Sequence, residues 1–270
     1  MLRQMTARRY LMCRPTYFDV TYAINPWMDP ATPVDRDLAA VQWDGLRAAY
    51  ERLGHRVELI EPHPELPDMV FAANCAFVVD GKVYGAQFRN PQRADEAPAY
   101  RSWFEAAGYA EVRIPKHTNE GEGDFTIAGG LVLAGTGYRT DHAAHLEAQE
   151  FLGRPVVTLT LVDPRFYHLD TALFVLDETN VAYFPAAFSV GSRRVLRSLF
   201  PDAIEATEAD ALAFGLNSVS DGRHVVVAAA ASDLIGALAD RGYEPVPVNL
   251  SELLKAGGGA KCCTLELRPA

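Results

Sequence analysis

The C-terminal segment combines backbone flexibility with a thiol. It reads Gly257-Gly258-Gly259-Ala260-Lys261-Cys262-Cys263-Thr264, so a glycine run leads into Cys262. Glycine lets the backbone approach a ligand closely, and a deprotonated thiol is a strong nucleophile. Cys262 is therefore the candidate nucleophile if the fold brings a base to it.

Two other segments supply a candidate base and candidate carboxylates. His168 and Asp170 lie in the segment Phe-Tyr-His-Leu-Asp-Thr at 166–171, and residues 119–125 read Asn-Glu-Gly-Glu-Gly-Asp-Phe. A nucleophile, a base and a carboxylate that lie far apart in sequence are normal for a site that the fold assembles. These residue types predict covalent catalysis by Cys262, with His168 as acid and base.

Composition limits the classes of protein to consider. The chain has 270 residues, 49% hydrophobic and 22% charged, which is typical of a folded domain with a large core. A net charge of -10 without a basic block argues against nucleic-acid binding and favours a small cationic ligand. The N-terminus lacks an apolar signal region and no apolar run is long enough for a bilayer, so we expect a cytoplasmic protein that binds no membrane.

The four cysteines, at positions 13, 75, 262 and 263, show neither a disulfide framework nor the paired spacing of a structural zinc site. We expect reduced thiols, no metal and no cofactor. Cys263 is expected to face away from Cys262 on an extended strand, as a structural thiol. Cys13 and Cys75 are expected in the core.

One unit recurs about every 45 to 50 residues, the range typical of repeat architectures. Half of the unit is a helical stretch that ends in Gly and precedes a short apolar strand, at Gly54, Gly108, Gly153 and Gly242, with a fifth copy at 193–200 that stops at Pro201. The other half is a hairpin, with predicted turns at Asp80-Gly81, Gly129-Gly130, near Asn180 and at Asp221-Gly222.

A polar residue stands at each hairpin start, at intervals of 50, 46, 47 and 45 residues: Asn74, Asp124, Asp170 and Asn217, with Cys262 next. Equivalent strand starts would converge in a closed ring of five strand-strand-helix-strand modules and gather these residues in a central cleft. The last strand, Cys262–Leu267, would pair with the first, Arg9–Cys13. An open α/β sheet is the alternative. We expect one domain over residues 1–270, with residues 1–8 a flexible tail.

These motifs carry a family resemblance. The modules, Glu-Gly-x-Gly-Asp at 120–124, His-x-Asp at 168–170 and Gly-Gly-Gly-x-x-Cys-x-Thr at 257–264 resemble the guanidino-group-modifying enzymes, or pentein superfamily. That resemblance implies a five-bladed α/β propeller with pseudo-fivefold symmetry. The segments at 12–15, 24–28, 69–74 and 165–171 are most similar to the catalytic domain of bacterial arginine dihydrolases, with dimethylarginine dimethylaminohydrolases as close relatives.

The resemblance implies hydrolysis of a guanidino group through a covalent amidino-Cys262 intermediate. We expect His168 to protonate the leaving amine and then to activate water, and Asp170 to accept guanidinium hydrogen bonds. Glu120 orients His168 or binds the guanidinium, with Asp124 close by. The usual family pattern, Glu-Gly-Gly-Asp, is one residue shorter, so Glu122 competes with Glu120 for the catalytic place; Glu120 is favoured.

Asn74 bears on the product. An amide offers both a donor and an acceptor and therefore suits a neutral urea as well as a guanidinium. The resemblance thus favours an arginine dihydrolase that yields ornithine, two ammonia and carbon dioxide. It further implies that Arg89 and Arg139 clamp the substrate carboxylate, that Asn25 contacts the α-amino end and that Ala256 belongs to the substrate site. Asn217 either serves this site or caps a turn.

Other functions stay open at this stage. A dimethylarginine dimethylaminohydrolase or an arginine deiminase would stop at citrulline, and an amidinotransferase would share the covalent intermediate. A metal-dependent ureohydrolase needs a larger cluster of Asp and His than His168 and Asp170 provide. A propeller without catalytic activity is also compatible with the fold. The sequence leaves the oligomeric state undefined, and a homo-oligomer is allowed.

Overall fold

The computed structural model describes residues 3–269, and within them short strands alternate with helices. The strands are β1 (Arg9–Cys13), β2 (Arg56–Ile60), β3 (Ala76–Val79), β4 (Lys82–Gly85), β5 (Glu111–Arg113), β6 (Phe125–Ala128), β7 (Leu131–Thr136), β8 (Val156–Thr160), β9 (Leu173–Asp177), β10 (Asn180–Tyr183), β11 (Ile204–Glu205), β12 (Val219–Ser220), β13 (His224–Ala228), β14 (Glu244–Val248) and β15 (Leu265–Glu266). The α-helices are α1 (Arg36–Arg52), α2 (Glu96–Ala106), α3 (His142–Leu152), α4 (Val190–Leu199), α5 (Glu208–Leu212), α6 (Ser232–Asp240) and α7 (Ser251–Leu254).

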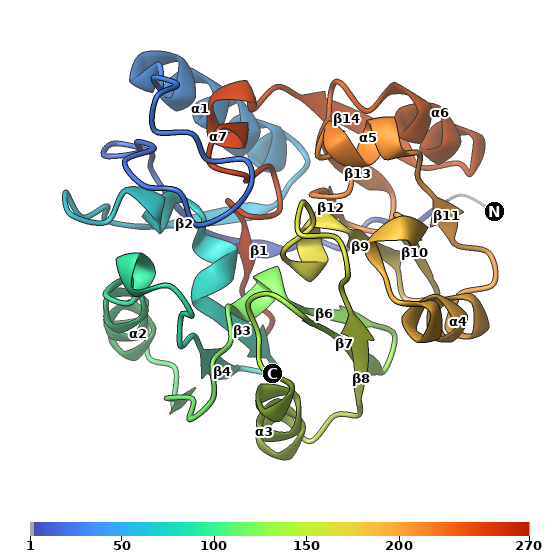
Figure 1. Ribbon diagram of the computed structural model, residues 1–270, viewed down its shortest axis with the longest axis horizontal. Helices are drawn as coiled ribbons and strands as arrows, with labels where there is room; N and C mark the ends of the chain where they lie inside the picture. Colours follow the sequence, from blue (N-terminus) through green and yellow to red (C-terminus); the bar gives the residue numbers. More distant parts are fainter. Residues whose placement is uncertain (1–2, 270) are drawn as a thin grey trace.

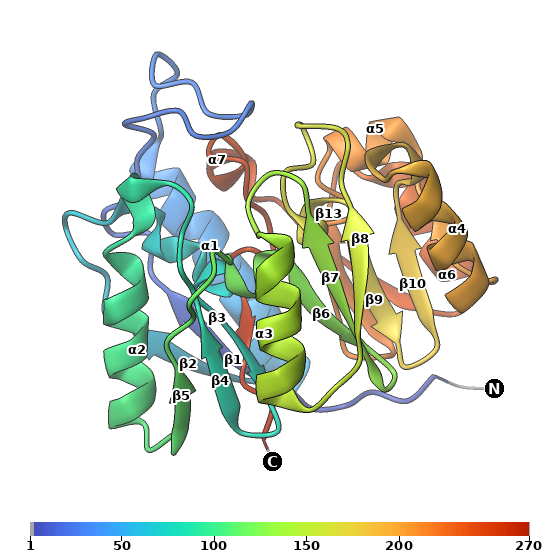
Figure 2. The ribbon, with the colours of Figure 1, turned by 60° about the horizontal axis from the view of Figure 1, so that its bottom comes forward.

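The described strands form five three-stranded sheets, in the orders β15-β1-β2, β3-β4-β5, β6-β7-β8, β11-β10-β9 and β12-β13-β14. In each sheet the middle strand has one antiparallel and one parallel neighbour, as in β3-β4-β5. Figure 1 shows the sheets around a common centre with α1, α2, α3, α4 and α6 outside them. In Figure 2, α2 and α3 run alongside the strands of their own modules. The predicted α/β class is confirmed, and the five sheets match the five expected modules.

The two ends of the chain meet in one sheet. β15 pairs antiparallel with β1 through Tyr10 opposite Glu266 and Leu11 opposite Leu265. The predicted pairing of the last strand with the first is therefore confirmed. The last strand is shorter than expected, because the Thr264 N–H donates to the Lys261 carbonyl (2.9 Å) and closes a turn around Cys262. Cys263 is consequently buried in this turn rather than on an extended strand.

Local signals explain where the elements end. The glycines that follow the predicted helices all have left-handed backbones, with φ of 84° at Gly54, 85° at Gly108, 68° at Gly153 and 79° at Gly242. The hairpin predicted to turn near Asn180 is confirmed. Asp177 pairs with Asn180, so the turn precedes Asn180, and an irregularity in the register follows it.

Buried apolar faces hold each helix on its module. In α1, Trp43, Leu46 and Tyr50 are buried and pack in one cluster with Tyr10 and Met12 of β1. Apolar residues three or four positions apart form one face of a helix, and their burial is the main stabilising contribution here. Within residues 3–269, none of the helices combines the length and apolarity required to cross a membrane.

Residues 3–8, which belong to the segment expected to be a flexible tail, contact other parts of the protein. Arg3 pairs with Asp177 (2.7 Å), the Thr6 N–H donates to the Asp221 carbonyl (2.8 Å), and Arg8 pairs with Glu266 (3.0 Å). These contacts join residues 3–8 to three of the sheets. Residues 1 and 2 of the expected tail lie outside the described residues.

Asp221 connects the β12–β13 hairpin to β2. Its Oδ2 contacts His55 Nε2 (3.3 Å) and His224 Nδ1 (2.8 Å), and its Oδ1 accepts from the N–H groups of Arg223 and His224. Burial opposes its charge, but these hydrogen bonds hold the pKa of Asp221 well below its usual range. A carboxyl whose pKa is lower in the folded state stabilises the fold above its unfolded pKa.

We expect Asp221→Asn to lower the free energy of unfolding by about 1–2 kcal/mol at pH 7, because His55 and His224 lose a charged acceptor. The difference from wild type should shrink as pH falls below about 4, where the carboxyl of the unfolded chain is protonated. Urea unfolding at several pH values measures this difference. Equal stability of both proteins at pH 7 would contradict the stabilising role of the ionised Asp221 carboxylate.

Candidate active site

His168 and Glu120 form a buried pair. His168 lies directly ahead of the 3-10 turn Leu169–Thr171, and Glu120 directly ahead of the turn Gly121–Gly123. His168 Nε2 lies 2.7 Å from Glu120 Oε2, and neither side chain is more than 1% exposed. Arg139 Nη1 donates to the same oxygen (2.8 Å). Burial opposes the charge of Glu120, but Arg139 and His168 hold its pKa well below the usual range.

This pairing fixes the position of one ring proton of His168. An ionised carboxylate only accepts hydrogen bonds, so His168 Nε2 must carry the proton that it shares with Glu120. His168 Nδ1 is buried and has no hydrogen-bond partner among the described residues. Nδ1 is therefore the ring atom available for proton exchange with a ligand.

Cys262 contacts two polar residues from equivalent positions of other modules. Its Sγ lies 3.3 Å from Asp170 Oδ2 and 3.1 Å from Asn217 Nδ2. Asn217 also accepts from the Cys262 N–H (3.0 Å) and donates to the Asp170 carbonyl (3.1 Å). The regular spacing of these three residues in the sequence thus corresponds to direct contacts, and Asn217 fixes the backbone at Cys262 rather than only capping a turn.

The thiol and the carboxyl disfavour each other's ionisation. Burial, followed by the charge of Asp170, raises the pKa of Cys262 well above its usual range. Burial likewise raises the pKa of Asp170 to about 7, although hydrogen bonds from Cys262 and Asn217 oppose the shift. Asp170 Oδ1 has no hydrogen-bond partner in the described part of the chain. A cation placed between Asp170 and Cys262 would favour ionisation of both groups.

Asn74 lies beside His168. Arg93 Nη1 donates to Asn74 Oδ1 (2.7 Å), and because a guanidinium has no acceptor, Asn74 must direct its Nδ2 away from Arg93. That Nδ2 has no partner among residues 3–269. It lies close to Gly123, where an added β-carbon would come within 2.4 Å of Asn74 Nδ2 and 3.2 Å of the His168 ring. Glycine at 123 lets the turn pack directly against both side chains.

A narrow cavity of about 10 Å³ joins several predicted site residues, which is room for about one water. Asn25, Asn74, Arg139, Ala256 and Cys262 all line it. Asn25 Nδ2 donates to the Ala256 carbonyl (3.0 Å), so these two predicted substrate contacts touch each other. Gly257, from the glycine run ahead of Cys262, also lines the cavity. The sequence analysis gave no individual role to the other lining residues: Ile24, Met28, Asp68, Phe71, Arg93 and Tyr167.

Arg93 and Asp68 are the chief residues missed. Arg93 is buried, pairs with Glu96 (2.7 Å) and donates to the Asp68 carbonyl (3.2 Å). Asp68 accepts from the Tyr22 hydroxyl (2.8 Å), and burial raises the pKa of Asp68. Neither residue belongs to the regular polar positions, so spacing gave no signal for them.

Four other residues considered for the site in the sequence analysis have contacts that differ from one residue to the next. Arg139 lines the cavity but is already paired with Glu120. Arg89 is half exposed, pairs with Asp141 and does not line the cavity. Asp124 is buried and accepts from the Leu169 N–H (3.0 Å), and burial raises its pKa to about 6. Glu122 pairs with Lys261 and Arg268, whereas His168 pairs with Glu120.

The described residues hold no group of three or more His, Cys, Asp or Glu side chains close enough to bind a metal ion. The expectation of a site without metal stays a prediction.

Comparisons with known proteins identify the family. Residues 23–269 match the family model described as N,N dimethylarginine dimethylhydrolase, eukaryotic. The chain is 54% identical to N(G),N(G)-dimethylarginine dimethylaminohydrolase of Mycobacterium tuberculosis, over 99% of this chain and 88% of that protein. It is 38% identical to the bifunctional arginine dihydrolase/ornithine cyclodeaminase AgrE of Nostoc, where it spans 38% of the longer relative.

A solved structure matches nearly the whole chain. The N-terminal domain of ArgZ, an arginine dihydrolase from the ornithine-ammonia cycle in cyanobacteria, superposes with a TM-score of 0.93, at 34% identity and 98% coverage of both chains. The predicted resemblance to guanidino-modifying enzymes is confirmed. The chain belongs to the dimethylarginine dimethylaminohydrolase family of the pentein superfamily and is a hydrolase of amidine carbon-nitrogen bonds.

Proposed function

We propose that the protein hydrolyses N(G),N(G)-dimethylarginine to citrulline and dimethylamine, with Cys262 as nucleophile. The 54% identity to the M. tuberculosis dimethylarginine dimethylaminohydrolase supports this reaction better than the arginine dihydrolase expected from the sequence, whose named relatives are more distant. The observation that carries the proposal is the buried contact between Cys262 Sγ and Asp170 Oδ2, in the same region as the His168–Glu120 pair.

A guanidinium suits the charge of this site. It delivers a positive charge and several N–H donors, and Asp170 Oδ1 is a buried acceptor that has no partner in the part of the chain that the structure describes. A cation beside Asp170 lowers the pKa of both Asp170 and Cys262, which favours the thiolate. The substrate thus activates its own nucleophile.

Cys262 then adds to the guanidinium carbon. Formation of the S–C bond converts that carbon to a tetrahedral centre, and the dimethylamino nitrogen takes a proton from His168 Nδ1. Dimethylamine leaves as its C–N bond breaks, and an amidino-Cys262 thioether remains. Glu120 supports this step because it holds the imidazolium through Nε2.

Water completes the cycle. His168 Nδ1, now neutral, accepts a proton from a water molecule that attacks the amidino carbon. Breakage of the S–C bond, with loss of the remaining hydroxyl proton to solvent, where dimethylamine takes one up, releases citrulline and restores Cys262. The sum is one dimethylarginine and one water converted to citrulline and dimethylamine, so atoms and protons balance.

Asn74 favours arginine dihydrolase as the second candidate. Because Arg93 occupies Asn74 Oδ1, Asn74 offers an N–H donor beside His168. A donor complements the carbonyl oxygen of citrulline, which supports retention of citrulline for a second hydrolysis to ornithine, ammonia and carbon dioxide. The ArgZ domain, described as an arginine dihydrolase, is structurally similar to this chain.

The finer statements about fold and location belong to the same proposal. The five sheets of like topology support a five-bladed propeller with pseudo-fivefold symmetry. The four buried, unpaired cysteines support a reducing compartment, and we place the protein in the cytoplasm. A substrate larger than the 10 Å³ cavity requires lining residues to move on binding.

We expect purified protein to convert N(G),N(G)-dimethylarginine to citrulline and dimethylamine, and Cys262→Ser to lose this activity. Mass spectrometry of the products, with arginine and citrulline as parallel substrates, measures the reaction. Ornithine from citrulline would favour the second candidate. Release of neither citrulline nor ornithine from any of the three substrates would contradict the proposed function.

We expect Gly123→Ala to lower kcat/KM by about a hundredfold, because a β-carbon at 123 displaces Asn74 or His168 by a distance that matters for reaction geometry. Gly130→Ala is the matched control, since a β-carbon at 130 meets nothing within 4 Å. Steady-state kinetics of both variants provide the comparison. Wild-type kinetics for Gly123→Ala would show that close packing at 123 is unnecessary.

A further inference from the structure

Glu122 is a buried carboxylate that the proposed reaction does not use. It lies in the turn between Glu120 and Asp124 and forms ion pairs with Lys261 Nζ and Arg268 Nη1. Its Oε2 also accepts from the Glu266 N–H (3.0 Å). Burial opposes its charge, but Arg268 and Lys261 lower the pKa of Glu122. Glu122 is therefore an ionised anchor for two cations of the C-terminal segment.

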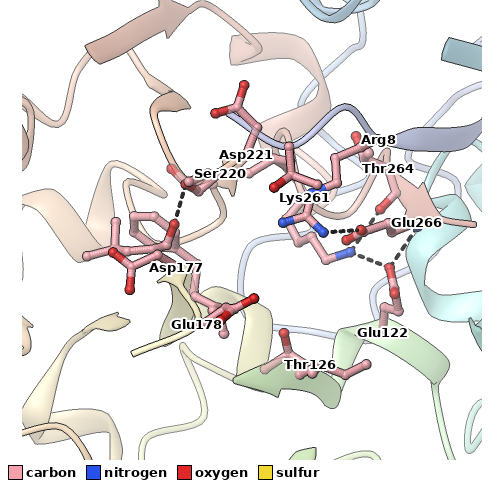
Figure 3. Close-up of a pocket in the computed structure, with 18 of the residues that line it drawn as sticks. Arg8, Glu122, Thr126, Asp177, Glu178, Ser220, Asp221, Lys261, Thr264 and Glu266 are labelled. Carbon is pink, nitrogen blue, oxygen red and sulfur yellow. Dashed lines mark hydrogen bonds and ion pairs between the residues drawn. The ribbon is translucent and has the colours of Figure 1, made fainter. Parts of the chain in front are cut away.

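Lys261 directly precedes Cys262, and contacts hold both its side-chain ammonium and its backbone. Its ammonium pairs with Glu122 and donates to the Thr264 carbonyl (2.9 Å). Its backbone N–H donates to the Asn217 carbonyl (3.1 Å), and Asn217 Nδ2 contacts Cys262 Sγ. Figure 3 shows Lys261 and Glu122 directed toward one another at the wall of a pocket.

We propose that Lys261 is a positioning residue for the reaction, because its ion pair with Glu122 holds the turn that carries Cys262 against the turn that follows Glu120. The inference rests on the proposed function and extends it to a residue outside the cavity that Cys262 lines. That cavity does not include Lys261, whereas a separate pocket of about 610 Å³ includes Lys261, Glu122 and Asp170. Lys261 thus lies outside the cavity that Cys262 lines and shares the larger pocket with Asp170.

The positive charge of Lys261 also affects the ionisation of Asp170 and Cys262. Asp170 is faced by Cys262 and Asn217, which hydrogen-bond it, by the positive Lys261 and by the negative Glu122. Lys261 lowers the pKa of Asp170 and Glu122 raises it. Both groups become anions on deprotonation and Lys261 directly precedes Cys262, so loss of its positive charge disfavours both deprotonations directly, whereas loss of the negative charge of Glu122 favours both.

Lys261→Met tests the proposal. We expect kcat/KM for N(G),N(G)-dimethylarginine at pH 7 to fall at least about tenfold, with the acidic limb of its pH profile shifted to higher pH. Lys261→Arg keeps the charge and should restore most of the activity and the wild-type pH profile. Equal loss in both variants with an unchanged pH profile would overturn the proposal.

Lys255→Met is the matched control. Lys255 pairs with Glu252 (2.7 Å) and donates to the Pro33 carbonyl (2.8 Å), so it makes the same kinds of contact away from Asp170. Its variant should keep the wild-type pH profile. A shift in this control equal to that of Lys261→Met would make the effect nonspecific and overturn the proposal.

Alkylation by iodoacetamide separates this inference from the proposed function, because it requires no substrate. Peptide mass spectrometry gives the labelling rate of Cys262 against pH, and we expect its midpoint to move to higher pH in Lys261→Met. Glu122→Gln should move the midpoint to lower pH, and it provides the test if Lys261→Met does not fold. Unshifted midpoints in the folded variants would overturn the positioning role; absence of turnover in wild type alone would overturn only the proposed function.

Discussion

Burial of carboxylates at the centre of the protein is the constraint on which the rest of the structure depends. A buried charge needs a partner, and the central carboxylates meet this need in two ways. Glu120 and Glu122 are paired with protein cations and keep low pKa values. The Asp170 side chain hydrogen-bonds the Cys262 thiol and, among the described residues, pairs with no cation, and its pKa is raised. The unpaired carboxylate beside Cys262 is thus the place that a cationic ligand completes.

Repetition of one module explains how these groups come together. The turns that precede β3, β6 and β9 carry or adjoin Asn74, Glu120 and His168, and the turn ahead of β6 contacts the other two. Cys262 lies in the corresponding turn ahead of β15, which the pairing with β1 holds in place. The site therefore depends on closure between the two ends of the chain as much as on any single module.

The sequence allowed prediction of those features that have local causes. Glycines after helices and Asp-Gly turns mark element ends, and regular spacing placed Asp170, Asn217 and Cys262 at equivalent positions that the structure joins by hydrogen bonds. Arg93 was missed because its contacts with Asn74 depend on packing between segments that share no spacing. The extended strand expected at 262–264 is a turn because its backbone groups bond locally, which apolar character alone does not reveal.

The covalent intermediate on Cys262 is the central claim, and acid quenching followed by mass spectrometry tests it most directly. Wild type quenched during the first turnovers of N(G),N(G)-dimethylarginine should carry the adduct, whereas His168→Asn, which lacks the proton donor for the leaving dimethylamine, should carry little of it. The account predicts that the peptide containing Cys262 gains the mass of the substrate less dimethylamine, and that Cys262 carries the modification. Turnover by the wild type without any adduct on Cys262, or an adduct on Cys263 instead, would contradict it.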